Sequence, residues 1–201
     1  MNQENHTHKK RKGLSFLTLS LIIAAITVFV FYIYLGDSEK NDPTLIINDK
    51  IVPTPEVIYE YINYVDHTDR KKTELHEYIS QGIQLLTASL TELVNLNQMQ
   101  DIEITNKRKE LWEIANYIKL NPQSEYLSDS IKVALLTSSE IIISVQEKNF
   151  TDLSPLALNL LEIAETINPN EPLNAQRNTI HLFFTESADI LKTMVMVRTS
   201  K

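Results

Sequence analysis

Apolar residues recur every three or four positions along most of the chain beyond residue 55. Because an α-helix turns once in about 3.6 residues, this spacing gathers them on one helical face. Asn121-Pro122 and residues 168–172 interrupt the pattern with turn-forming residues. The pattern therefore predicts helices over residues 55–98, 101–120, 124–148, 151–167 and 173–197.

The first of these segments fits one long helix or two shorter ones. Thr54 and Pro55 are typical of a helix start, as an N-cap followed by a proline in the first turn. A polar interval near residues 66–69 interrupts the apolar stripe, which resumes at Leu75. We favour a break or kink there, and a single helix over residues 55–98 is the alternative.

The predicted helices are joined by short connections, which favour antiparallel neighbours. We therefore expect an all-α domain over residues 55–201, built as an up-and-down antiparallel bundle of four to six helices. No motif repeats at a fixed period, which argues against a helical-repeat array.

The apolar stripes identify the residues expected in the core of this bundle. In the second helix, Leu111 and Trp112 belong to the inner face, and we expect Trp112 to be a core anchor. Truncation of a buried tryptophan to alanine costs about 3–5 kcal/mol. Ser138 is the one polar member of the third stripe, small enough to bond back to its own turn. The fourth stripe consists of Leu156, Leu160, Leu161, Ile163, Ala164 and Ile167.

A different pattern lies near the start of the chain, where no residue from Leu14 to Leu35 carries a charge. At about 1.5 Å per residue, a helix over this stretch reaches roughly 33 Å, enough to cross a hydrocarbon core of about 30 Å. Aromatic rings at its far end, which prefer the headgroup level, are Phe31, Tyr32 and Tyr34. We expect contact with the lipid bilayer through residues 14–35.

The charges beside this stretch predict its orientation. Residues 9–12 are all basic, and basic flanks stay in the cytoplasm. The expected layout is a cytoplasmic tail (1–12), a transmembrane helix (13–36), a linker (37–54) and an extracytoplasmic helical domain (55–201). The chain is then a single-pass protein of the cell inner or plasma membrane, with its C-terminal domain periplasmic or extracellular.

Two kinds of processing would remove this anchor. A secretory signal peptide has an apolar region of about 7–15 residues and a cleavage site between small residues. Here the apolar run is longer, and Tyr34 and Gly36 do not make such a site. The basic segment ending at Gly13 resembles the leader of a type IV prepilin, but Thr18 stands where that pattern has Glu. We therefore favour a permanent anchor.

The linker contains two short apolar runs on either side of Asn48-Asp49. Asn and Asp tolerate turn conformations, so the runs fit a small β-hairpin. An isolated hairpin is marginally stable, and an extended tether is the alternative.

The chain carries a net charge of −7, and since residues 1–36 contribute +3, the remainder contributes −10. An acidic domain repels phosphate backbones, so nucleic acid is not an expected partner. The chain has no cysteine, which excludes disulfides, thiolate metal sites and a lipid-modified cysteine.

The histidines lack the spacing of helical metal sites. His67, His76 and His181 occur in neither a Glu-x-x-His nor an H-E-x-x-H motif. We expect His181 at the surface or the core boundary, and axial haem ligation by His181 with Met99 is the alternative.

Two acidic pairs, Glu162 with Glu165 and Glu186 with Asp189, each share a helix face. Two facing pairs would bind a cation or act as acid and base. Acidic surfaces give the same spacing, and the chain has no nucleophile motif or phosphate-binding glycine loop. We therefore expect no metal, no cofactor and no enzymatic activity.

The candidate partner surface is formed by Tyr59, Tyr61 and Tyr64, close together at the start of the helical domain. Tyrosine is favoured at protein contacts because it combines apolar area with a polar tip. Asn149-Phe150-Thr151 has the form of a glycosylation sequon, which would indicate an exposed loop.

These features favour a non-enzymatic interaction or scaffold subunit of a cell-envelope assembly, with a protein partner in the envelope. One alternative is a module that binds a small ligand between its helices and signals through a separate membrane partner. A second alternative is a metal- or haem-binding bundle. A deep polar-lined cavity would favour ligand sensing, and a filled core would favour the scaffold.

Overall fold

The computed structural model describes residues 44–47, 50–68 and 73–199. The predicted cytoplasmic tail (1–12) and transmembrane helix (13–36) lie outside these residues. Within the described ranges, no helix combines the length and the apolar composition needed to cross a membrane.

Two short strands open the described part of the chain. β1 (Thr44–Ile47) pairs antiparallel with β2 (Lys50–Pro53), so that Thr44 lies opposite Pro53. Of the two interpretations of the linker, the hairpin is therefore confirmed. β2 also lies next to the last helix, α7 (Leu173–Thr199), so the hairpin packs with the helical domain.

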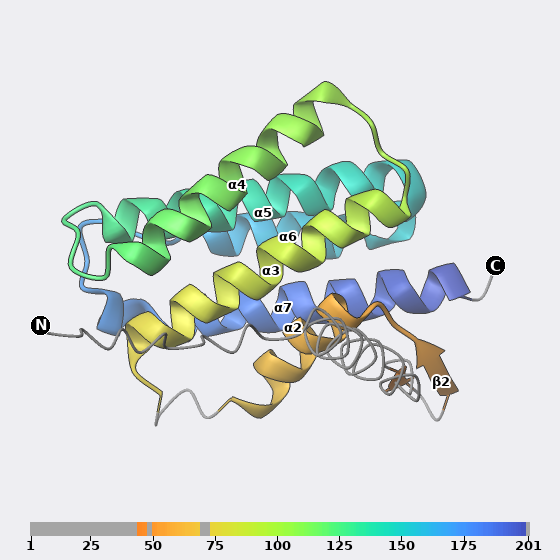
Figure 1. The fold of residues 1–201 in the computed structure, drawn as a ribbon, viewed down its shortest axis with the longest axis horizontal. Helices are drawn as coiled ribbons and strands as arrows, with labels where there is room; N and C mark the ends of the chain where they lie inside the picture. Colours follow the sequence, from red (N-terminus) through yellow and green to blue (C-terminus); the bar gives the residue numbers. More distant parts are fainter. Residues whose placement is uncertain (1–43, 48–49, 69–72, 200–201) are drawn as a thin grey trace, which may run out of the picture. The chain divides into compact units, whose positions relative to one another are not determined.

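Six α-helices follow within the described residues (Figure 1). Besides α7 they are α2 (Glu56–His67), α3 (Leu75–Leu96), α4 (Ile102–Leu120), α5 (Leu127–Asn149) and α6 (Ser154–Glu165). A short 3-10 helix, η1 (Thr151–Leu153), precedes α6. The polar interval does break the first segment, because α2 ends at His67 and α3 begins only at Leu75.

Several helix ends follow directly from the sequence. Asp101 caps α4, because its side chain accepts a hydrogen bond from the backbone N–H of Glu103 at 2.7 Å. Pro122 prevents α4 from continuing past Leu120. Pro155 lies in the first turn of α6, where no backbone N–H is required.

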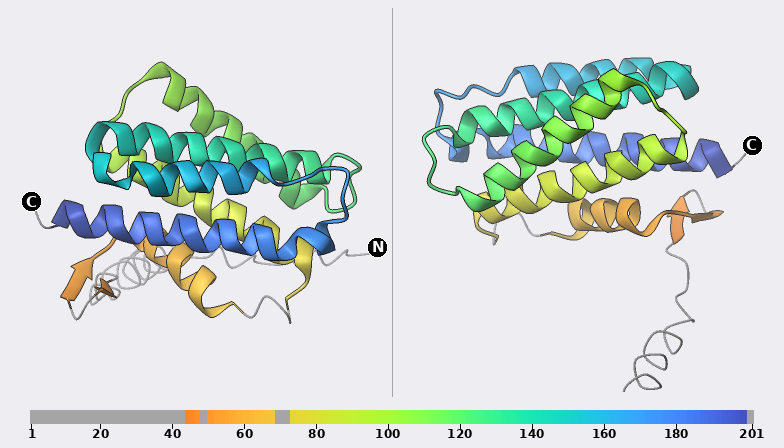
Figure 2. Two further views of the ribbon diagram at one scale, coloured as in Figure 1. Left: turned by 180° about the vertical axis from the view of Figure 1, so that it is seen from behind. Right: turned by 45° about the horizontal axis from the view of Figure 1, so that its top comes forward.

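Four helices, α3, α5, α6 and α7, form a bundle in which each packs against the next around a shared core. α2 lies against both α3 and α7, and α4 lies against both α3 and α5. Consecutive helices run in opposite directions (Figures 1 and 2). The expected all-α, up-and-down bundle is thus confirmed for the described residues.

The core is built from the predicted stripes, with two corrections. Trp112 is 61% exposed, whereas its neighbour Leu111 is 1% exposed. Successive residues lie about 100° apart around a helix, so only one of the two can face the core. Leu156 is likewise exposed, because Ala157 takes the inward position on α6. The buried positions of α4 are Ile104, Leu111, Ala115 and Ile118.

Ser138 occupies the place expected from the third stripe. It is 1% exposed, and its hydroxyl donates a hydrogen bond to the backbone carbonyl oxygen of Ala134 at 2.7 Å. This bond satisfies the hydroxyl within its own helix, so a polar residue is tolerated in the core.

Trp112→Ala should change the free energy of unfolding by no more than about 1 kcal/mol, because the indole is mostly exposed. Its matched control is Leu111→Ala, which removes a buried side chain one position away and should cost about 2–5 kcal/mol. Urea-induced unfolding, followed by far-ultraviolet circular dichroism, compares the two variants. A larger loss for Trp112→Ala than for Leu111→Ala would reverse this assignment.

Candidate functional site

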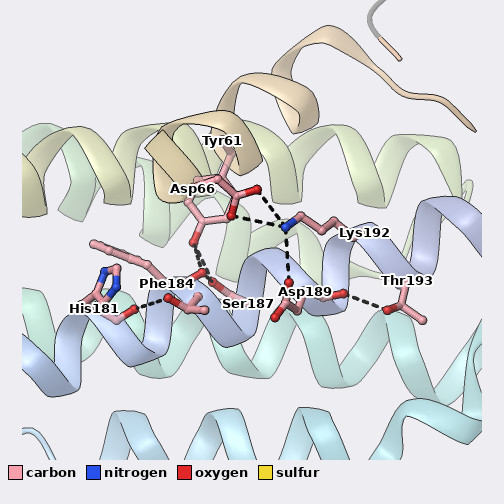
Figure 3. Close-up of polar contacts among 9 residues, drawn as sticks. Tyr61, Asp66, His181, Phe184, Ser187, Asp189, Lys192 and Thr193 are labelled. Carbon is pink, nitrogen blue, oxygen red and sulfur yellow. Dashed lines mark hydrogen bonds and ion pairs between the residues drawn. The ribbon is translucent and has the colours of Figure 1, made fainter. Parts of the chain in front are cut away.

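Tyr61, one of the three tyrosines of the candidate partner surface, lies in the core instead. It is fully buried between α2 and α7 (Figure 3). Its hydroxyl lies 2.6 Å from the Oγ of Ser187 and donates to the backbone carbonyl oxygen of Phe184 at 3.2 Å. Burial raises the pKa of Tyr61 far above its usual value, so the hydroxyl stays protonated and holds α2 to α7.

Tyr64 is half-buried and also packs inward. Its hydroxyl donates to the backbone carbonyl oxygen of Tyr78 at 2.9 Å, and the two rings stack with centroids 5.9 Å apart. Burial raises the pKa of Tyr64 as well. Tyr59 is partly exposed and lies nearly opposite Tyr61, since residues two apart differ by about 200° around a helix. The three tyrosines therefore do not form one surface.

His181 lies at the core boundary, with its Nδ1 2.7 Å from the hydroxyl of Tyr78. Tyr78 is near the start of α3, whereas Met99 follows the end of that helix. At about 1.5 Å per residue, Tyr78 and Met99 lie more than roughly 25 Å apart. The structure therefore does not bring His181 and Met99 to one haem iron. His67 and His76 each contact a backbone carbonyl oxygen, of Asn63 and Ile118 respectively.

The acidic pairs lie on α6 and α7, where Glu162, Glu165 and Asp189 are exposed. Asp189 contacts the Nζ of Lys192 at 3.4 Å, and Lys192 also bridges to Asp66 of α2 at 3.0 Å (Figure 3). Exposed ion pairs of this kind contribute about 0–1 kcal/mol. Across residues 44–47, 50–68 and 73–199, no three His, Asp or Glu side chains are arranged to hold a metal ion.

Asn149, the acceptor of the sequon, does not present its amide to solvent. Its Nδ2 is buried and has no hydrogen-bond partner among the described residues. Asn149 as a whole is half-buried, Phe150 is buried and Thr151 is exposed, so the sequon lies only partly at the surface.

An apolar cavity of about 270 Å³, partly open to the surface, lies where the start of α2 and the ends of α3 and α7 meet the junction between α5 and η1. It is lined by Pro55, Leu93, Leu96, Phe150, Met194, Val195, Arg198 and Thr199. Sequence reasoning did not find it, because a stripe of apolar residues gives no signal for how closely helix ends pack.

Large apolar side chains are exposed along α4 and the connection that follows it. Trp112 and Leu120 are eight residues apart, which places them along one ridge of α4. Leu120 is 75% exposed, and Tyr126 on the α4–α5 connection is 61% exposed. We define the α4 surface as Trp112, Tyr117, Leu120 and Tyr126.

Part of the α4 surface borders a shallow depression at the α4–α5 connection. It has a volume of about 520 Å³ and is lined by Tyr117, Leu120, Asn121, Pro122, Gln123, Ser124, Glu125 and Tyr126. The hydroxyl of Tyr117 lies 2.6 Å from the Oγ of Ser124, which holds the ring beside the connection. This connection is at the opposite end of the helical domain from the hairpin (Figures 1 and 2).

Comparison of the chain with protein-family models, with curated proteins and with solved structures found no match.

Proposed function

We propose that this chain is a single-pass membrane protein with a cytoplasmic N terminus. Its helical domain acts outside the cytoplasm as a non-enzymatic interaction or scaffold subunit of a cell-envelope assembly. The uncharged stretch from Leu14 to Leu35 and the basic residues before it support the membrane attachment and its orientation. The α4 surface is the proposed contact with a protein partner.

The exposed side chains of the α4 surface are the observation that carries this proposal. Single apolar residues at a surface are ordinary, but here five large ones, Ile102 and the four of the α4 surface, lie on one helix and its following connection. Three of them, Tyr117, Leu120 and Tyr126, border the same depression. Tryptophan and tyrosine are enriched at protein contacts, where they combine a large apolar area with a polar tip. Burial of a leucine-sized side chain gains about 1.5–3 kcal/mol, so a partner that covers this surface is stabilised by it.

The α4 surface replaces Tyr59, Tyr61 and Tyr64 as the proposed contact. Tyr61 is needed in the core, and Tyr64 is tied to Tyr78, so neither side chain is free to engage a partner. Tyr126, by contrast, has most of its area exposed.

Photo-crosslinking in intact cells tests the proposal. With p-benzoylphenylalanine in place of Tyr126, irradiation should give a discrete adduct between the chain and a second protein. Protease added to sealed spheroplasts should then degrade the adduct and the helical domain, because both lie outside the cytoplasm. Immunoblotting with an antibody against the helical domain measures both results.

Leu158 is the matched control, since it is an exposed leucine on α6, away from the α4 surface. The same crosslinker at Leu158 should give no discrete adduct. Equal adducts from both positions, or none from Tyr126, would refute the α4 surface as the contact. Survival of the helical domain during protease treatment would refute the proposed topology.

A second candidate function, the binding of a small ligand, is favoured by the apolar cavity at the ends of α3 and α7. This cavity differs from the polar-lined one expected of a sensing module, because apolar side chains dominate its lining. The chemistry of its lining therefore limits the class of ligand.

A further inference from the structure

The interior of this cavity is apolar. Leu93 and Leu96 come from the end of α3, Met194 and Val195 from the end of α7, and Phe150 from the α5–η1 junction. Such a lining offers water few hydrogen-bond partners, and an apolar cavity of about 150 Å³ stays dry and binds benzene. At about 270 Å³, this cavity has room for a longer apolar group.

One of the residues that line the cavity, Arg198, is positively charged. Arg198 lies in the last turn of α7, is exposed, and makes no ion pair with any described residue. It is also the one charged residue among those that line the cavity in the described part of the chain. A guanidinium presents parallel N–H donors that match the two oxygens of a carboxylate. An apolar interior with a cationic rim is complementary to an anionic amphiphile.

The volume sets the scale of that amphiphile. The pocket is partly open, and at about 270 Å³ it exceeds an apolar cavity of about 150 Å³ that holds benzene. This size suits a single medium-length acyl chain.

We propose that this cavity binds a medium-chain fatty acid of about ten carbons. The acyl chain lies among the leucine, methionine, valine and phenylalanine side chains, and the carboxylate pairs with Arg198 at the rim. The site goes beyond the interaction role of the domain and does not depend on membrane attachment.

Isothermal titration of fatty acids into the full-length chain tests the proposal. The chain is held in phosphatidylcholine nanodiscs so that no detergent competes for the cavity, and empty nanodiscs supply the background. Decanoate should bind saturably above this background. From hexanoate to decanoate the affinity should rise about fourfold per added methylene, and it should level off once the cavity is full.

Two variants distinguish the contribution of Arg198 to binding from that of the apolar interior. Arg198→Gln removes the charge from an exposed side chain and should weaken decanoate binding about tenfold, with decanol binding unchanged. Leu96→Trp places an indole in the cavity from its half-buried edge and should abolish binding of both compounds. Lys119→Gln is the matched control, since it removes a positive charge from the last turn of α4, away from the cavity.

The proposal is overturned if decanoate gives no saturable binding above empty nanodiscs. It is also overturned if Arg198→Gln and Lys119→Gln have the same effect, because the carboxylate then has no specific partner. A third result would assign the cavity to a protein contact instead. In that case decanoate does not bind the unmodified chain, and Leu96→Trp abolishes the adduct formed by photo-crosslinking at position 126.

Discussion

Replacement of Phe184 by alanine is expected to lower the free energy of unfolding of the helical domain by about 3–5 kcal/mol. The ring is fully buried and lies edge-to-face against Tyr61 and Tyr78, with centroids 6.5 Å and 5.7 Å away. A third aromatic contact, with Phe183, lies at 6.3 Å. Truncation would leave a void among rigid rings that cannot collapse into it, and aromatic pairs add about 0.5–1.5 kcal/mol each beyond area burial. Urea-induced unfolding measures the change.

Leu182→Ala is the matched control for this variant, because Leu182 lies two positions earlier on α7 and is 45% exposed. Its truncation should cost less than about 1 kcal/mol. Similar losses for the two variants would mean that the aromatic cluster is not the centre of the core.

Gly82→Leu should destabilise the domain by about 3 kcal/mol through steric overlap. Gly82 lies in the middle of α3, where glycine normally costs about 1 kcal/mol relative to alanine. A Cβ at this position would lie 2.6 Å from the Cε2 atom and 2.7 Å from the Cζ atom of Phe184. The absence of a side chain therefore lets α3 approach the Phe184 ring on α7. Thermal unfolding of the variant, followed by circular dichroism, measures the loss.

Gln81→Leu provides the control, since it introduces the same side chain one position earlier on an exposed face of α3. It should change stability by about 0.5 kcal/mol or less. The double variant Gly82→Ala/Phe184→Leu should lose less stability than the two single variants lose together. The smaller leucine side chain makes room for the new Cβ at position 82. Strict additivity would show that the two positions are not in contact in solution.

The helices could be predicted from the sequence because their signals are local. Asn121-Pro122, the polar interval around residues 66–69 and the three-or-four spacing all act within a few residues of the positions they determine. Short-range steric and hydrogen-bonding rules therefore predict where α2 and α3 separate and where α4 ends.

The candidate site depends on distant contacts, and there the sequence was less informative. Trp112 and Leu111 are both apolar neighbours, and only the packing of α4 decides which one faces inward. Tyr61 follows the apolar spacing of the first segment, which fits its burial, and its tyrosine side chain also fitted a contact surface. Its partner Ser187 lies on a helix more than a hundred residues later, which no local pattern indicates. Gly82 has no local signal at all, since its role is set by Phe184.

The antiparallel pairing of α2 with α7 brings the beginning and the end of the helical domain together. Pro55, just before α2, and Thr199, at the end of α7, border the same cavity. A short glycine–serine peptide would therefore join these two points without strain, and new termini opened at Gln123 would leave every helix intact. The domain is thus suited to circular permutation, because the start of α2 and the end of α7 lie close together.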